Sequence, residues 1–237
     1  MTEADDTISD ELLDTLDELF DLAAEDPEEA YSTFQSFPEE VRELIQFQMA
    51  LAGIEKLLER FEEAEKRLRS LLATRPDDAD LHHQLADLLE DSGNLKDANH
   101  HFLETLRLDG LEPAASNPEI EKRVEATVKD VIESLPPNFQ SKLAHVPLFI
   151  EPRPAREVVE GGLDPRSLGL FEGVDHAADL NQEARLAPTR IVLFIENLLA
   201  EIGDGPELED EVAITVLHEV GHYFGLDEAD MERLGLD

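Results

Sequence analysis

The stretch LHEVGHYFGLDEAD, Leu217 to Asp230, decides how the C-terminal half of this chain is interpreted. It contains His218, Glu219 and His222 in the arrangement H-E-x-x-H. Residues four apart on a helix lie one turn apart on the same face, so the two imidazoles would point to the same side. The apolar residues upstream follow helical spacing, which predicts a helix that begins near Glu207 and runs through the motif.

Two imidazoles one turn apart have the spacing that they need to share one metal ion. The chain contains no cysteine, so the metal ligands must be histidines and carboxylates, which suits Zn²⁺. Glu219 is displaced around the helix, where it can reach a water activated by the metal without binding the metal itself. H-E-x-x-H is expected by chance only about 0.04 times in this composition. The motif predicts zinc-dependent hydrolysis with His218 and His222 as ligands and Glu219 as general base.

A third protein ligand must come from the short segment that follows the motif, because a catalytic zinc takes three protein ligands. Gly225, three residues after His222, can adopt a left-handed conformation and end the helix. Glu228, three residues further on, is the predicted third ligand, and Asp227 and Asp230 are the alternatives. Asp227 is also well placed to cap the final helix, and both assignments can hold together.

Upstream of the motif, the pattern predicts one long helix and a small sheet. Asn117 and Pro118 are a suitable N-cap and first residue for an amphipathic helix that ends before Pro136. Three short apolar runs predict strands: His145–Glu151, Leu168–Gly173 and Arg190–Leu198. The last run is apolar on both faces, so we expect it inside the sheet.

These features together resemble the small bacterial zincin-like metallopeptidases, often called minimal zincins. The resemblance extends from about Pro118 to Asp237. It rests on SLPPNF, HVPLFIEPRP, LGLFEG, RIVLFIENL and HEVGHYFGLDEADMERLG. It implies a compact α+β zincin core and peptidase activity. The family usually has Asp at the third-ligand position, where this chain has Glu228, and no Met-turn follows the motif.

The N-terminal half repeats itself at an interval of 34 residues. Phe61–Asp78 aligns with Leu95–Glu112, and a weaker copy begins at Pro27. This interval resembles the tetratricopeptide repeat (TPR) and predicts about three helical hairpins in residues 11–112, with an ordinary helical bundle as the alternative. Such a unit would bind a peptide, a protein partner or the chain's own second domain.

The remaining histidines carry no ligand-like pattern. His82, His83, His100 and His101 form two adjacent pairs, and neighbours in sequence point in different directions on a helix. We assign them to packing or to the surface. His176 and Arg190 could lie near the cleft, although no spacing requires it.

Composition limits the partners. The chain has 237 residues, with 57 Asp and Glu against 19 Lys and Arg, and a net charge of −38. Such a surface repels nucleic acid and anionic membranes, so neither is an expected partner. The acidic N-terminus does not look like a signal peptide and no apolar run reaches membrane-spanning length, which predicts a cytoplasmic protein.

The sequence therefore predicts three parts: a mobile acidic tail at residues 1–10, TPR-like repeats at 11–112 and a metallopeptidase domain at 113–237. The expected function is zinc-dependent hydrolysis of peptides or proteins that the repeats recruit. One alternative is an inactive TPR adaptor whose zinc site is structural or a relic. Another is a peptidase whose cleft is covered by its own N-terminal half.

Overall fold

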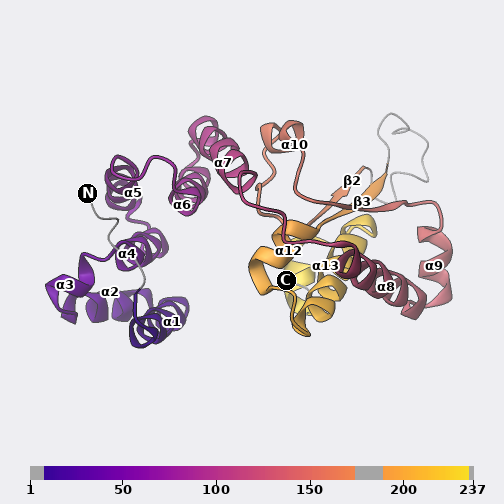
Figure 1. Ribbon diagram of the computed structural model, residues 1–237, viewed down its shortest axis with the longest axis horizontal. Coiled ribbons are helices and arrows are strands. Elements are labelled where there is room, and N and C mark those ends of the chain that lie inside the picture. The colour runs from indigo at the N-terminus through magenta and orange to yellow at the C-terminus, as the bar shows by residue number, and fades with distance from the viewer. Residues whose placement is uncertain (1–7, 174–188, 235–237) are drawn as a thin grey trace. The chain divides into compact units, whose positions relative to one another are not determined.

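The computed structural model describes residues 8–173 and 189–234, and the chain divides into two units, Met1–Leu111 and Glu112–Asp237 (Figure 1). The acidic tail predicted at residues 1–10 lies mostly outside the described residues. Within the described ranges, no helix combines the length and the apolar character that a membrane span requires.

The described part of the first unit is helical throughout. Its helices are α1 (Asp10–Glu25), α2 (Pro27–Ser36), α3 (Glu39–Arg42), α4 (Ile45–Leu57), α5 (Phe61–Leu72), α6 (Ala79–Asp91) and α7 (Leu95–Asp109). The second helices of the three hairpins, α2, α5 and α7, begin 34 residues apart, and so do α4 and α6. The predicted period is therefore the period of the helices, and the hairpins form a TPR-type stack.

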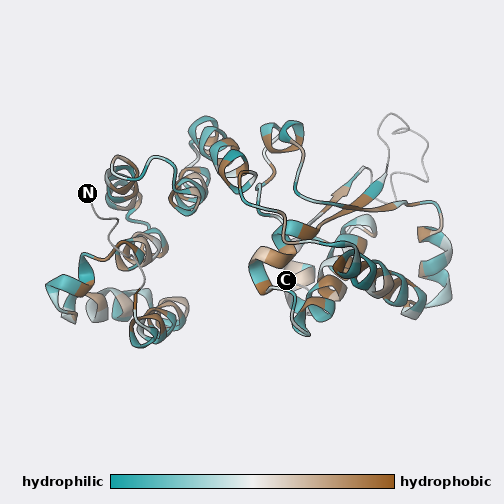
Figure 2. Cartoon of the chain, in the orientation of Figure 1, coloured by the Kyte–Doolittle hydropathy of each residue, from teal (hydrophilic) through white to brown (hydrophobic). Residues whose placement is uncertain are grey.

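The same period governs the core of this unit. Ala30, Ala64 and Ala98 occupy equivalent positions and are at most 2% exposed. Four residues after each alanine stands a large apolar residue, and all three are buried: Phe34, Leu68 and Phe102. A methyl group at the close approach and a bulky group one turn later let neighbouring helices interlock. Figure 2 shows hydrophobic and hydrophilic residues on every helix of the stack, as amphipathic packing requires.

The second unit combines helices with a small mixed sheet. Its described elements are α8 (Pro118–Ser134), α9 (Pro137–Leu143), β1 (Leu148–Glu151), α10 (Arg156–Glu160), β2 (Gly169–Glu172), β3 (Arg190–Phe194), α12 (Ile195–Ile202), α13 (Glu207–Tyr223) and α14 (Glu228–Leu234). The strand order is β1-β3-β2, with β1 parallel and β2 antiparallel to β3. The central place of β3 confirms the expectation drawn from its apolar faces, since Ile191 to Phe194 are all buried.

The third predicted strand is wrong in its second half. The run Arg190–Leu198 is a strand only as far as Phe194, and α12 begins at Ile195. Inside α12, the side chain of Asn197 donates hydrogen bonds to the carbonyl oxygens of Pro165 (2.9 Å) and Ser167 (2.7 Å). Those bonds tie the first turn of α12 to the loop before β2, and apolar composition alone did not indicate them.

Helix α13 crosses the sheet and carries the motif. It packs against β2, β3 and α8, and in Figure 1 α8 and α13 lie side by side below the sheet. Val212, Val216 and Val220 are at most 5% exposed and form its buried stripe. The stripe fixes the rotation of α13, so the opposite, half-buried side is left for the histidines.

A buried carboxylate fixes the start of this unit. Glu196, which is 3% exposed, accepts hydrogen bonds from the backbone N–H groups of Ala115 (2.8 Å) and Ser116 (3.2 Å) and from the Ser116 hydroxyl (2.5 Å). Burial pushes the pKa of Glu196 upward, but these hydrogen bonds outweigh burial and hold the pKa below its usual value. The next residue, Asn117, caps α8 by accepting from Glu119 and Ile120, as predicted.

Candidate functional site

The two histidines of the motif converge. The Nε2 atoms of His218 and His222 are 3.0 Å apart, and both rings are half-buried on α13. Two ligands at about 2.0–2.1 Å from one tetrahedral zinc would be about 3.3 Å apart. The separation of the ring nitrogens therefore fits a shared zinc ion.

The backbone after α13 orients His222. Gly225 has φ +82°, and the N–H groups of Gly225 and Leu226 donate to the carbonyls of His222 (2.9 Å) and Gly221 (3.1 Å). These two bonds form the Schellman arrangement that ends helices, so Gly225 has its predicted role. The turn places the carbonyl oxygen of Leu226 3.3 Å from Nδ1 of His222. A proton on Nδ1 directed at that oxygen leaves the Nε2 lone pair facing the metal position.

Glu219 is buried between α13 and β2. Only 6% of it is exposed. Gly169, the first residue of β2, lies so close that a Cβ there would be 2.8 Å from Oε1 of Glu219 and 2.9 Å from its Cγ. The glycine in LGLFEG is therefore required by the close approach of strand and carboxylate. The sequence shows a glycine at the start of an apolar run, but it does not show that this glycine faces Glu219.

A pocket of about 270 Å³ opens beside these residues. It lies between the N-terminal end of β2 and the exposed side of α13. Its walls are Ser167, Leu168, Gly169, Glu211, Ile214, Thr215, His218 and Glu219. A pocket that contains both the proposed base and one proposed ligand is large enough to hold a side chain of a bound molecule.

The acidic residues after the motif divide into two groups. The carboxylate of Asp227 accepts from the N–H of Asp230 (3.0 Å), and Asp230 accepts in return from the N–H of Asp227 (3.4 Å). This reciprocal pair caps α14, so the capping role of Asp227 is confirmed. Glu228 is the first residue of α14, but its side chain lies outside the described residues. Among the described side chains, no third His, Asp or Glu completes a group of three metal ligands with the two histidines.

Met231 of α14 packs against the helix that carries the motif, α13. It is fully buried, and a Cβ added at Gly221 would overlap its side chain. Gly221 lies between Glu219 and His222, so the glycine of HEVGH lets α14 pack directly on the turn that carries the site. Met231 follows too closely to form a Met-turn, yet it fixes α14 against α13.

The other residues considered from the sequence lie elsewhere. His82 of α6 and His101 of α7 are both buried between helices, and their Nδ1 atoms are 2.8 Å apart. Packing was predicted for them, but this pairing was not, because it joins different helices.

Arg190 bonds Glu172 (2.5 Å) and approaches Glu151 (3.4 Å) on the two neighbouring strands. The hydrogen bond from Arg190 to Glu172 raises the pKa of Arg190. Arg190 therefore links neighbouring strands of the sheet. His176 lies outside the described residues.

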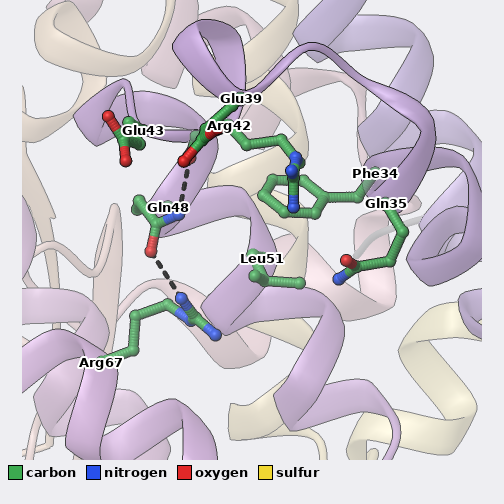
Figure 3. Close-up of a pocket in the computed structure, with 8 residues that line it drawn as sticks. All are labelled: Phe34, Gln35, Glu39, Arg42, Glu43, Gln48, Leu51 and Arg67. Atoms are coloured by element: carbon green, nitrogen blue, oxygen red, sulfur yellow. Dashed lines mark hydrogen bonds between the residues drawn. The ribbon is translucent and has the colours of Figure 1, made fainter.

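The first unit has a polar pocket of its own, of about 260 Å³, formed by α2, α4, α5 and the segment around α3 (Figure 3). Gln48 links its walls: Nε2 donates to the carbonyl of Arg42, and Oε1 accepts from Arg67 (both 2.5 Å). Arg67 also forms a two-pronged ion pair with the buried carboxylate of Glu55 (2.7 and 3.0 Å). A second pocket of about 500 Å³ shares Gln48 and Arg67, so this face of the repeats is hollowed over a wide area.

Comparison with known families agrees with both halves of the structure. Residues 143–236 match the family described as zincin-like metallopeptidase, and residues 57–115 match the tetratricopeptide repeat. The architecture is thus an α+β zincin-like unit preceded by an all-α TPR unit. A search of curated proteins gave no match to the chain.

Proposed function

We propose that the second unit is a zinc-dependent peptidase and that the repeats recruit its protein substrate or a protein partner. The observation that carries the proposal is the convergence of the two Nε2 atoms to 3.0 Å with the buried carboxylate of Glu219 on the next residue. The match of residues 143–236 to zincin-like metallopeptidases supports the same chemistry.

His218, His222 and Glu228 would hold the zinc. Asp227 and Asp230 are less suitable, because each already accepts a backbone N–H of the other and Asp230 also pairs with Arg233. Glu228 lies on the first turn of α14, three residues after Gly225, at which α13 ends. A carboxylate is an acceptable third ligand for zinc.

When bound, zinc lowers the pKa of water and polarises the carbonyl of the scissile bond. Glu219 takes the proton from the attacking water at its carboxylate and returns it to the nitrogen of the leaving amine. Because Gly169 has no side chain, the carboxylate of Glu219 fits against the start of β2, where we expect it to be positioned before substrate binds.

Strand β2 is the natural place for an extended peptide. Among the described residues it pairs with β3 along one edge, and its first residue contacts Glu219. A peptide that pairs with the other edge of β2 would bring its backbone beside the base and the zinc ligands.

The repeats would act by binding. Their hollowed face displays both carboxylates and cations, among them Glu39, Glu43, Arg42 and Lys66, so a polar peptide segment is the expected ligand. The match of residues 57–115 to the tetratricopeptide repeat supports this role.

The deciding experiment measures zinc content and peptide cleavage in the same preparations. Wild type is expected to hold about one zinc per chain by mass spectrometry and to cleave members of a peptide library. His222→Ala and Glu228→Ala should lose both properties, whereas Glu219→Gln should keep zinc and lose cleavage. His145→Ala, which removes an exposed histidine, is the control and should change neither.

Other outcomes separate the alternatives. Zinc that is retained in Glu228→Ala would move the third ligand to Asp227 or Asp230. Zinc bound without any cleavage would favour a TPR adaptor with a structural zinc site. Absence of zinc after reconstitution would refute the metal site itself.

A further inference from the structure

The pocket beside Glu219 contains one acidic group that the chemistry above does not use. Glu211 lies on α13 seven residues before His218, so the two residues share a face of the helix about two turns, or 10.5 Å, apart. Both line the pocket, which therefore extends from the zinc ligand at one end to a carboxylate at the other.

The walls between these ends are largely apolar. Leu168 comes from the loop before β2 and Ile214 from α13. A pocket with an apolar middle and a carboxylate at its far end suits a long side chain with a methylene stem and a cationic head.

Glu211 is available for such a ligand. It is half-buried, and the carboxylate forms no ion pair or hydrogen bond with any described residue. Glu209, two residues earlier on α13, differs because it is paired with Arg123 at 2.8 Å. A half-buried carboxylate without a cation gains more from a bound cation than an exposed one does, because less water screens it.

The charge of the whole chain acts in the same direction. With a net charge of −38, the surface attracts cationic peptides before they reach the site.

We propose that this pocket selects a lysine or arginine side chain of the substrate next to the scissile bond, with Glu211 as the specificity-determining residue. The inference rests on the proposed function, since it assumes that the scissile bond of the bound substrate lies beside the side chains of His218 and Glu219. Glu211 contributes to the choice of substrate and does not take part in bond cleavage.

The test measures binding separately from cleavage. The zinc-loaded full chain carrying Glu219→Gln is titrated with sets of fluorescent peptides. Within a set, the peptides differ at one position, which holds lysine, acetyl-lysine, leucine or glutamate. Successive sets move this position along the peptide. At one position, lysine is expected to bind about tenfold more tightly than acetyl-lysine. The preference should fall below about twofold after Glu211→Gln and should shift to glutamate after Glu211→Lys.

Asp210→Asn is the matched control. Asp210 is exposed, lies next to Glu211 on the same helix and does not line the pocket. Its substitution removes the same charge from the chain and should leave the lysine preference unchanged. An equal loss in both variants would overturn the proposal, because net charge would then explain the preference.

Cleavage by the wild-type chain separates this inference from the proposed function. Zinc-dependent cleavage without a Glu211-dependent preference for lysine or arginine would overturn the inference and leave the peptidase. A Glu211-dependent preference in binding, with no cleavage of any peptide, would support the pocket and count against hydrolysis. Failure of every lysine peptide to bind more tightly than its acetylated form would overturn the inference outright.

Discussion

The buried pair His82–His101 should make the third repeat sensitive to mild acid. Nε2 of His82 lies 3.1 Å from the carbonyl oxygen of Pro76, so it carries a proton and donates it. The Nδ1 of neutral His82 is then an acceptor, and Nδ1 of His101 donates to it across 2.8 Å. A second proton on His101 would place a positive charge in this buried contact.

His101 resists protonation in the folded chain. Burial first, and then the positive charge of His82, His100 and Arg69, lowers its pKa to about 4, although Asp97 opposes the shift. The unfolded chain takes up this proton near pH 6.5. Because the folded pKa is the lower one, stability is complete above about pH 6.5 and is lost as the pH falls towards 4. The full difference is about 3 kcal/mol, of which about 2 kcal/mol is lost by pH 5.

Amide hydrogen exchange followed by mass spectrometry can measure this loss in the full chain. Peptides from α6 and α7 are compared at pH 7 and pH 5, with peptides from α13 as the internal reference and after correction for intrinsic rates. In wild type, the free energy of opening of α6 and α7 should fall by about 2 kcal/mol more than in His101→Leu. The comparison between variants is necessary because acid also reduces the self-repulsion of this acidic chain, which stabilises every variant alike.

His145→Leu is the control, since His145 is exposed and belongs to the second unit. It should behave as wild type does. If α6 and α7 lose the same stability in wild type and in His101→Leu, the assignment of the acid response to this histidine is refuted.

Two further predictions concern close contacts. Gly169→Ala places a methyl group against Glu219 and should reduce cleavage about tenfold to a hundredfold while zinc content is unchanged; unaltered cleavage would show that the carboxylate position does not matter. Arg67→Met leaves the buried carboxylate of Glu55 without its partner and should lower the free energy of unfolding by about 3 kcal/mol in urea titrations. Replacing both residues by methionine should restore most of that loss. Arg69→Met, at an exposed ion pair, should cost less than about 1 kcal/mol, and an equal cost at both arginines would contradict the argument.

Much of the fold followed from local pattern. The 34-residue interval predicted the spacing of the helices, because the same alanine and the same bulky residue must recur wherever equivalent helices meet. The motif helix, its end at Gly225 and the caps at Asn117 and Asp227 followed from residue chemistry that acts within one or two turns. The family resemblance rested on the same short stretches.

The strand that turned into a helix shows the limit of pattern. Arg190–Leu198 is apolar throughout, and an apolar run of that length is compatible with either structure. The choice depends on contacts from distant parts of the chain, namely the carbonyl oxygens that Asn197 reaches and the backbone that Glu196 binds.

Which residues of one helix face the same way follows from their spacing along the chain. His218 and His222 share a face because a helix has 3.6 residues per turn, and no information from elsewhere in the chain is needed. Only the packing of the folded chain decides which residues meet across elements: Gly169 against Glu219, His82 against His101, and Glu211 in one pocket with Leu168. Those contacts join residues 19 or more positions apart, and their geometry depends on how whole helices and strands pack.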